Sequence, residues 1–371
     1  MKVLLLAALN SAHTIKWANA LAGRGVEVIV AGFVESDTSQ FNRDIQTFSF
    51  GLPASLNAKS FGSFAKLRYL LALPKLKSLL RKVKPDIMHA HLASSYGLLG
   101  SLSGFHPFIV SVWGFDVYSF PQKSFLHKGS LKWVFRKGDI ILSTSSIMAK
   151  ETSKYTPKQV LVTPFGIDTE VFKPDGAENP SELVIGTVKS LEKWYGIDYL
   201  MKAFKLTRER HPELPLRLLI VGGGSMYEYY RQLAKELGIE EVTEFTGFVP
   251  YQQIPEYHNK LDIYVALSVF EDESFGVAVL EAQACGKPVI ISRIGGLPEV
   301  VAEGKSGFLV NPRDEEAAAS AMEILVLNAA KRNEMGNNGR AFVSEFYDLE
   351  HNTDKMIGIY KSALKRSEVE S

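Results

Sequence analysis

The stretch of sequence that decides the fold covers residues 263–299 and reads IYVALSVFEDESFGVAVLEAQACGKPVIISRIGGLPE. It opens with an apolar run that predicts a buried strand over Ile263–Leu267. A helix is predicted over Phe275–Ala284, where Gly286 ends it, and a second strand follows over Pro288–Ile291. Strand, helix and strand in this order indicate one unit of a parallel sheet.

Two acidic residues in this stretch, Glu273 and Glu281, have seven residues between them. Glu273 is expected in the loop before the helix, Glu281 on the helix, and Ser274 as the helix cap. Free amides near Gly276 would form an anion site at the positive end of the helix dipole. The two acids would lie about 12 Å apart, which is close to the distance between the sugar and the ribose of a nucleotide diphosphate sugar. The simpler interpretation, for an arbitrary pair, is a capped helix with two solvated acids.

The same stretch, together with Gly295-Gly296-Leu297-Pro298-Glu299, resembles the donor-binding segment of the retaining GT-B glycosyltransferases of family 4, the glycosyl transferases group 1 family. The resemblance covers nearly the whole chain, is strongest over 183–312 and is looser before Pro164. It implies an α/β fold of two Rossmann-like, doubly wound domains with an interdomain cleft. It also implies a retaining transfer of a hexose or N-acetylhexosamine from a nucleotide diphosphate sugar to a hydroxyl of a glycan or lipid-linked acceptor.

The composition is that of an ordinary globular protein of 371 residues, with 46% hydrophobic and 22% charged residues. A net charge of +1 gives no global field that would attract nucleic acid. The single cysteine, Cys285, excludes a disulfide framework and suits a reducing cytoplasm. No apolar run is long enough for a transmembrane helix, and Met1–Leu9 is interpreted as the first strand, not as a signal peptide.

Strands and helices alternate along both halves of the chain, which predicts two doubly wound sheets. A turn-rich segment, 173–182, separates the halves and is the expected linker. The expected domains are an acceptor-side domain over 1–172 and a nucleotide-sugar-binding domain over 183–348. From the resemblance, the terminal helix within 349–371 is expected to pack back on the first domain. Helical structure is predicted over Lys66–Lys84, and Pro74 is expected to break this segment in two.

Two lysines follow the first strand of the second half, Leu183–Val188. No Asp-x-Asp metal motif lies in a fitting strand context, so fixed cations and helix amides would have to stabilise a departing diphosphate. Lys189 matches the basic residue of the family pattern. Lys193 lies one residue before the usual lysine position, which Trp194 occupies here. Glu273, Lys189 and Lys193 are the expected catalytic residues and no metal is expected; the alternative for each lysine is a solvated surface amine.

The expected donor-binding residues come from three segments of the second half. The glycine turn after Leu216–Val221 is a weak phosphate or base signal by itself, and in the family it lines the donor cleft. The segment Thr246–Pro250 resembles the one whose backbone meets the nucleobase. The complete set is Glu281, Ser274, Phe275, Gly276, Val277, Gly222, Gly223, Phe248 and Val249.

The expected acceptor-side residues lie at strand ends of the first half. Asn10 and His13 occupy the first strand-to-helix turn, where His13 would orient an acceptor hydroxyl or phosphate, or would only be a polar residue at the helix start. In His89-Ala90-His91 the two histidines point to the same side, and His91 is the better site candidate because His89 is expected to be a satisfied interior residue.

Ser111–Asp116 corresponds to a family segment that often contains His-Gly, and Trp113 stands in place of that histidine. A general acid or base is therefore absent there, and Trp113 would stack on a sugar face. Asp116 would bond acceptor hydroxyls or, as an equal alternative, cap a turn. Phe165 replaces an asparagine of the family pattern and is interpreted as structural.

A basic, leucine-rich segment covers 59–84 and contains no acidic residue. Such a segment can bind the anionic inner face of a membrane, and lipid-linked acceptors would give it a reason to do so. The alternative is a packed leucine face with a solvated basic face.

Three other classes of function stay open from the sequence. A nucleotide-sugar epimerase or hydrolase on the same fold would turn over donor without acceptor. A nicotinamide-dependent enzyme would need Gly-x-Gly-x-x-Gly at the first turn, and Asn10-Ser11-Ala12-His13 does not supply it. A non-catalytic binding protein is the weakest of the three alternatives.

Overall fold

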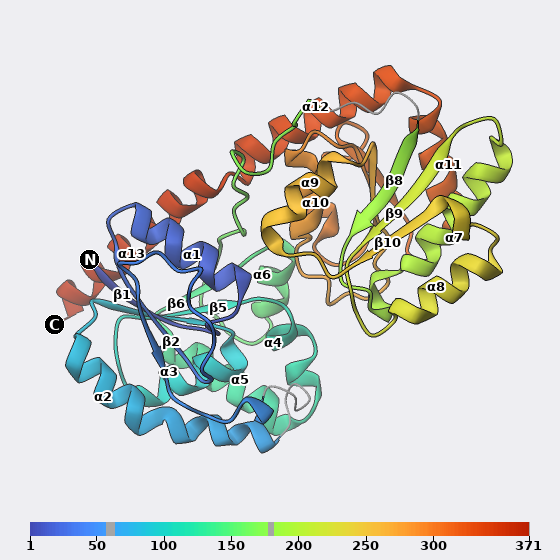
Figure 1. Ribbon diagram of the computed structural model, residues 1–371. Helices are drawn as coiled ribbons and strands as arrows, with labels where there is room; N and C mark the ends of the chain where they lie inside the picture. The colour runs from blue at the N-terminus through green and yellow to red at the C-terminus, as the bar shows by residue number, and fades with distance from the viewer. Residues whose placement is uncertain (57–63, 177–181, 371) are drawn as a thin grey trace. The chain divides into compact units, whose positions relative to one another are not determined.

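The computed structural model describes residues 1–56, 64–176 and 182–370. The chain forms two compact units, one made of Met1–Phe165 with Leu349–Ser371 and the other of Gly166–Asp348. Each unit is built on its own parallel sheet with helices packed against it (Figure 1).

The first unit contains, among its described residues, a seven-stranded sheet in the order β3-β2-β1-β4-β5-β6-β7. Neighbouring strands are parallel throughout. The central strands are buried along their length, which explains why they appear in the sequence as continuous apolar runs. The strands are β1 (Lys2–Leu6), β2 (Glu27–Gly32), β3 (Gln46–Ser49), β4 (Ile87–His91), β5 (Phe108–Val112), β6 (Ile140–Ser143) and β7 (Val160–Val162).

Helices cover both faces of this sheet (Figure 1). Leu76, Leu99 and Leu131, from three different helices, belong to one apolar core with the strand residues Leu4 and Val110. The helices are α1 (Ala12–Gly23), η1 (Ala54–Leu56), η2 (Phe64–Ala72), α2 (Leu73–Val83), η3 (Ala93–Gly97), α3 (Leu98–Ser103), α4 (Phe115–Tyr118), η4 (Phe120–Gln122), α5 (Phe125–Lys137), α6 (Ser146–Thr152) and α13 (Leu349–Glu370).

The terminal helix α13 packs against α1 in the first unit. Arg24 at the end of α1 pairs with Glu350 and, at 3.0 Å from Nε, with Asp354. Deeper in the unit, the Tyr360 hydroxyl lies 2.8 Å from Nδ1 of His89 on β4. The last helix therefore completes the unit that the first residues of the chain begin.

The second unit contains, in its described part, a six-stranded parallel sheet in the order β10-β9-β8-β11-β12-β13. The order reverses between β8 and β11, which is where α/β sheets characteristically bind ligands, at the carboxyl ends of the strands. The strands are β8 (Leu183–Val188), β9 (Leu216–Val221), β10 (Thr243–Gly247), β11 (Ile263–Ala266), β12 (Val289–Ser292) and β13 (Gly307–Val310).

The helices of the second unit bury an apolar core that includes Phe204 of α7, Tyr230 of α8 and Met322 of α11. Helix α10 packs mainly on α12 and on the short helix α9. The helices are η5 (Lys193–Tyr195), α7 (Ile197–Arg210), α8 (Tyr227–Glu236), η6 (Glu240–Val242), η7 (Tyr251–Gln253), α9 (Ile254–Asn259), α10 (Val277–Ala284), η8 (Leu297–Val300), α11 (Glu315–Val326) and α12 (Ala329–Phe346).

The chain enters the second unit after Phe165, earlier than the boundary expected at residue 172. The Ile167 amide donates to the Tyr347 carbonyl at 2.7 Å, so the entering and leaving segments pair with each other inside this unit. Asn259 of α9 donates to the carbonyl of Lys173 at 2.9 Å and accepts from the amide of Asp175. The start of the expected linker is thus bound to the second unit, and its residues 177–181 lie outside the described ones.

One helix prediction is confirmed and one needs correction. The helical segment predicted over Lys66–Lys84 is divided near Pro74, as expected, into a 3-10 helix, η2, and α2, because Pro74 cannot continue an i to i−4 bond pattern but suits the first turn of a new helix. The helix predicted from Phe275 begins at Val277, and its N-cap is Gly276 with φ +96° and no side-chain cap. Ser274 is therefore not the helix cap.

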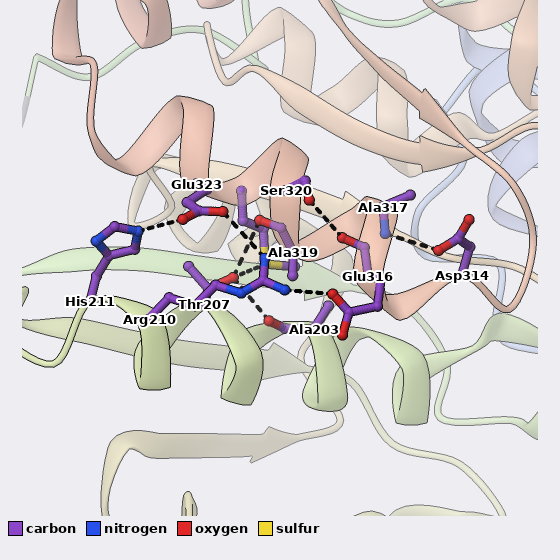
Figure 2. A network of polar contacts seen from close by, with 11 residues as sticks. Ala203, Thr207, Arg210, His211, Asp314, Glu316, Ala317, Ala319, Ser320 and Glu323 are labelled. Carbon is purple, nitrogen blue, oxygen red and sulfur yellow. Dashed lines mark hydrogen bonds and ion pairs between the residues drawn. The ribbon is translucent and has the colours of Figure 1, made fainter.

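An ion-pair network joins α7 to α11 on the surface of the second unit (Figure 2). Arg210 pairs with both Glu316 and Glu323, and His211 Nε2 lies 2.7 Å from Oε1 of Glu323. The hydrogen bond with Glu323 raises the pKa of His211 above its ordinary value, and the same bond lowers the pKa of Glu323.

These shifts predict how the stability of the second unit depends on pH. Because the folded pKa of His211 is raised, its contribution is complete below the unfolded pKa of about 6.5 and is lost as pH rises through the folded value. The melting temperature of wild type minus that of His211→Gln should therefore fall between pH 6 and pH 9. Replacing the exposed His351 of α13 with Gln provides a control matched for residue type. A difference that stays constant with pH for His211→Gln would contradict the assigned pair.

Candidate functional site

Lys189 and Glu273 meet at the carboxyl edge of the second sheet. Lys189 directly follows β8, and Glu273 lies in the loop after the neighbouring parallel strand β11. Lys189 Nζ lies 2.8 Å from Glu273 Oε2, and the side chains are only 18% and 11% exposed. The Ser268 hydroxyl donates to the same carboxylate oxygen at 3.1 Å. Lys189 Nζ also lies 4.1 Å from the ring centroid of Tyr195, a cation–π contact.

The electrostatics of this pair keep the lysine charged. Burial is the largest single effect and lowers the pKa of Lys189. The negative charge of Glu273, its hydrogen bond and the neighbouring Tyr195 and Tyr264 together outweigh burial, so the pKa lies above its ordinary value. A partly buried ammonium is less screened by water than a surface one, and its field on a neighbouring anion is correspondingly stronger. The arrangement can therefore present a fixed cation and a hydroxyl-accepting carboxylate side by side.

Two glycines hold the loop that carries Glu273. The Gly296 amide donates to the Glu273 carbonyl at 2.8 Å. A Cβ atom added at Gly296 would lie 2.2 Å from the Ser274 carbonyl oxygen, and one at Gly295 (φ +53°) would lie 2.1 Å from that of Glu273. The backbone of the Glu273 loop thus rests directly on these glycines, which explains the Gly-Gly pair after β12.

The glycine turn after β9 supports Lys189 in the same way. The Gly222 amide donates to the Gly247 carbonyl at 3.1 Å, and a Cβ atom at Gly222 (φ +140°) would lie 2.1 Å from the Lys189 carbonyl oxygen. Gly224 packs equally closely on the Leu191 carbonyl. Close backbone packing accounts for Gly222 and Gly224, and phosphate binding by Gly222 and Gly223 stays a prediction.

The residues around the start of α10 differ in how far their side chains are exposed to solvent. The Phe275 ring is buried against Tyr347, with ring centroids 5.7 Å apart, so only its backbone is available to a ligand. Gly276 adopts a left-handed conformation, and a Cβ atom there would lie 2.6 Å from the Leu297 side chain. The space beside this glycine is therefore filled by Leu297. Ser274 and Val277 are half-buried at the helix start.

Glu281 lies on α10 and is almost completely buried, with 4% of its surface exposed. The Tyr251 hydroxyl donates to its Oε1 at 3.0 Å, and Nε2 of His258 lies 3.7 Å from its Oε2. The simpler interpretation of two solvated acids is wrong, because Glu273 and Glu281 are each enclosed by specific partners.

Other predicted donor-side residues lie at the surface. Lys193 is exposed in η5, and no ion pair recorded among the described residues includes it. Trp194, at the usual lysine position, is 47% exposed, and Phe248 is 84% exposed next to the nearly buried Val249. The structure thus brings Lys189 to Glu273 but does not bring Lys193 to them.

Four aromatic side chains gather at the carboxyl edge of the first sheet. His13 from the first turn of α1 stacks on Phe165 with centroids 4.1 Å apart. Trp113, directly after β5, lies 4.6 Å from the ring of His91 at the end of β4 and 5.3 Å from Phe165. Phe165 is thus a member of the cluster, in agreement with its structural interpretation, while the exposed Asn10 precedes α1 in the same turn.

The two histidines of β4 have different surroundings. Nδ1 and Nε2 of His89 bond to Tyr360 and Ser111, and burial lowers the pKa of His89 to about 3, which confirms it as a satisfied interior residue. Burial also lowers the pKa of His91 well below its ordinary value. The Nδ1 atom of His91 is buried with no hydrogen-bond partner among the described residues. Of the two histidines on β4, His91 is therefore the one with a ring nitrogen that makes no hydrogen bond within the described residues.

Asp116 does not serve as an acceptor-binding group. Its carboxylate accepts the amides of Ala93 at 2.8 Å and of Trp113 and Gly114 at 3.0 Å, and its side chain is completely buried. Burial raises the pKa of Asp116, while hydrogen bonds from backbone amides act in the opposite direction. The turn-capping alternative is correct, and Asp116 fixes the backbone that presents Trp113.

Sequence reasoning missed Tyr195, Ser268, Tyr251 and His258. Ser268 directly follows the predicted strand Ile263–Leu267, and Tyr195 follows Trp194 in the segment after Lys189. Their closeness in sequence to Glu273 and Lys189 was therefore a usable signal. Tyr251 and His258 lie on η7 and α9, and only the packing of α9 on α10 brings them to Glu281. No short-range pattern reveals that contact.

We predict that Gly296→Ala disturbs the Glu273 loop. The added methyl group would overlap the Ser274 carbonyl, and overpacking of this kind costs about 1–3 kcal/mol. Urea unfolding of the two variants measures the cost. Gly358→Ala on α13 is the control, because nothing lies within 4 Å of the added atom and the change should be neutral or stabilising by roughly 0.5–1 kcal/mol. Equal stabilities of the two variants would contradict the close packing.

The described residues contain neither a metal-binding cluster nor a membrane-spanning helix. No group of three or more His, Cys, Asp and Glu side chains in 1–56, 64–176 and 182–370 is placed to hold a metal ion. In that same part of the chain, no helix combines the length and the apolar character needed to cross a membrane.

Family models match both units. The model described as glycosyl transferases group 1 matches residues 168–342, and the glycosyl transferase 4-like model matches residues 2–145. D-inositol 3-phosphate glycosyltransferase of Corynebacterium urealyticum is 34% identical over 60% of this chain and 56% of its own length. A GDP-mannose-dependent phosphatidylinositol monomannoside mannosyltransferase of Mycolicibacterium smegmatis is 32% identical over 48% of this chain and 50% of its own. The chain thus spans about half the length of the curated relatives it matches.

Solved structures resemble nearly the whole chain in fold. Sucrose-phosphate synthase from Thermosynechococcus elongatus aligns with a TM-score of 0.80 at 20% identity, over 98% of both chains. Anabaena HepE in complex with UDP-glucose aligns with a TM-score of 0.79 at 20% identity, over 98% of this chain and all of that one. These similarities confirm the expected GT-B class of fold, with two Rossmann-like domains.

Proposed function

Because the chain belongs to the glycosyl transferases group 1 family, we propose that it transfers a hexose or N-acetylhexosamine from a nucleotide diphosphate sugar to a hydroxyl group. The acceptor that we propose is a glycan or a lipid-linked sugar. The names of the relatives support a nucleotide-sugar donor, and the complexes of Anabaena HepE with UDP and UDP-glucose support it further.

The observation that carries this proposal is the Lys189–Glu273 pair at the carboxyl edge of the second sheet. A nucleotide diphosphate sugar needs a cation where negative charge develops on the leaving diphosphate and an acceptor for sugar hydroxyls next to it. Lys189 supplies the cation and Glu273 the hydroxyl acceptor, and the two groups lie 2.8 Å apart. Ser268 donates a hydrogen bond to Glu273, and the ring of Tyr195 contacts Lys189. A cation fixed before the reaction stabilises the transition state without reorganising.

The remaining donor-side roles follow from position along the chain. We assign the diphosphate to the amides of Phe275 to Val277 and to Lys193, and the ribose hydroxyls to Glu281. The glycine turn and the backbone at Phe248 and Val249 would line the nucleotide. These assignments agree with a reaction that needs no bound metal and that retains the configuration of the sugar, as the family resemblance implies.

We assign the acceptor to the first unit, at the cluster formed by His13, His91 and Trp113. The exposed part of Trp113 offers an apolar surface for a sugar ring, and Asn10 offers an amide in the same turn. His91 is the polar group with capacity to spare, since its Nδ1 has no hydrogen-bond partner in the described part of the chain.

The test of the proposed function is sugar transfer by Glu273→Gln. A thermal-shift screen of UDP, GDP and ADP with their sugars first identifies the donor, because a bound ligand raises stability by about 2.7 kcal/mol at a hundredfold excess over Kd. Glu273→Gln should then reduce transfer about a hundredfold or more when assayed below the melting temperature of the variant, which the loss of the charge beside the partly buried Lys189 is expected to lower. Glu271→Gln, an exposed neighbour, should transfer normally.

Two outcomes would contradict this function. Near-normal transfer by Glu273→Gln would show that Glu273 does not bind the reacting sugar. Turnover of the donor at full rate without any acceptor would instead indicate an epimerase or hydrolase on the same fold.

We also propose that the first unit binds an anionic membrane surface on the cytoplasmic side. Helix α2 exposes Lys75, Lys77, Arg81 and Lys82, while Leu76 and Leu79 on its other face are buried in the core. The contact would therefore be electrostatic and would not insert these leucines. Residues 57–63 of the basic segment lie outside the described ones.

Flotation with liposomes tests this contact. Binding should increase with the fraction of anionic lipid and decrease in the double variant Lys77→Gln, Arg81→Gln. Lys361→Gln with Lys365→Gln on α13 removes the same charge elsewhere and should leave binding unchanged. Equal binding to neutral and anionic vesicles would exclude the electrostatic contact.

A further inference from the structure

The buried carboxylate of Glu281 accepts fewer hydrogen bonds from the described residues than an ionised carboxylate can accept. An ionised carboxylate has room for about four hydrogen bonds, and burying it without them is costly. The described part of the structure supplies one, from the Tyr251 hydroxyl to Oε1 at 3.0 Å. The nearest further donor is Nε2 of His258, and at 3.7 Å from Oε2 it lies beyond hydrogen-bond distance. One side of this carboxylate therefore has capacity for a ligand.

His258 reinforces this conclusion. Its side chain is completely buried, and neither ring nitrogen has a hydrogen-bond partner among the described residues. The rings of Phe172 and Tyr264 flank it, with centroids 6.1 and 5.6 Å away. Apolar packing therefore fixes the imidazole beside Glu281, with its polar capacity unused. A buried polar pair left incomplete in this way is unusual and calls for a functional explanation.

Tyr251 supplies the hydrogen bond that the Glu281 carboxylate accepts within the described part of the structure. The residue is 42% exposed, but its hydroxyl donates to the buried carboxylate. Burial and the charge of Glu281 raise the pKa of Tyr251, so the hydroxyl stays protonated and remains a donor. Without this donor, the carboxylate would turn toward His258, the nearest remaining donor, and away from a ligand.

We propose that Tyr251 is a positioning residue that orients Glu281 for the ribose hydroxyls of the donor, and thereby determines selectivity for ribonucleotides. Tyr251 holds Oε1, which leaves Oε2 and the free lone pairs of the carboxylate to accept from the 2′- and 3′-hydroxyls. His258 is the competing partner that makes this support necessary. The inference rests on the proposed function, because it assumes a nucleotide donor whose ribose lies at Glu281.

The test compares UDP, GDP and ADP, each with its 2′,3′-dideoxy analogue, by calorimetry on the full chain. Wild type should bind one ribonucleotide much more tightly than its dideoxy partner. In Tyr251→Phe the ribonucleotide should lose about tenfold or more in affinity, the value expected for one hydrogen bond to a charged group, while the dideoxy analogue stays within about twofold. The ratio of the two dissociation constants does not depend on the fraction of protein that is folded.

Two further readouts separate positioning from general damage. In transfer assays, Tyr251→Phe should raise the donor KM with kcat nearly unchanged, because Tyr251 does not contact Lys189 or Glu273. Tyr229→Phe removes the hydroxyl of another half-exposed tyrosine, on α8, and should leave both the ratio and KM unchanged.

Each contrary result has a distinct meaning. If wild type binds none of the nucleotides, the nucleotide-sugar function fails and the inference fails with it. If wild type binds a ribonucleotide and its dideoxy analogue equally, the function stands but Glu281 does not bind ribose, and the inference is overturned. If Tyr251→Phe keeps the wild-type ratio, Glu281 binds ribose without help from Tyr251, and the positioning role is overturned.

Discussion

Parallel pairing around β8 is the constraint on which the second unit's site depends. Because β8 and β11 are parallel neighbours, the residues that follow them emerge at one edge of the sheet. Lys189 and the Glu273 loop therefore meet in the fold, although 84 positions separate the two residues in the sequence. The glycines after β9 and β12 let the backbone pack closely on the loops that carry Lys189 and Glu273, and this packing holds both loops in place.

The sequence predicted the parts of this site that depend on strand ends. Lys189 and Glu273 could be placed because apolar runs mark where their strands stop. The cap at Ser274 was wrong because Gly276 takes a left-handed conformation that starts the helix two residues later than predicted. Tyr251 could not be assigned from the sequence, because it reaches Glu281 only through the packing of one short helix on another. Long-range packing of that kind leaves no local pattern.

In the first unit, too, the sequence predicted best the residues whose positions depend on strand ends. His13, His91 and Trp113 were placed together because they follow adjacent parallel strands. For Asp116 the sequence left acceptor binding and turn capping as equal alternatives, since an aspartate two residues after a glycine suits a ligand as well as a backbone amide. Three amide bonds decide the matter. The aromatic cluster also explains how the structure accommodates tryptophan at position 113: the rings of His91 and Phe165 lie beside it.

The return of α13 to the first unit has a consequence for synthesis on the ribosome. Residues 1–165 leave the ribosome long before α13, since the whole of Gly166–Asp348 is translated between them. Until then the nascent first unit lacks Tyr360 beside His89 and the acidic partners of Arg24. The second unit, continuous in sequence, can complete its folding first. The domain that begins the chain is therefore the last to be finished, and its exposed α1 face is the surface that a chaperone would have to protect meanwhile.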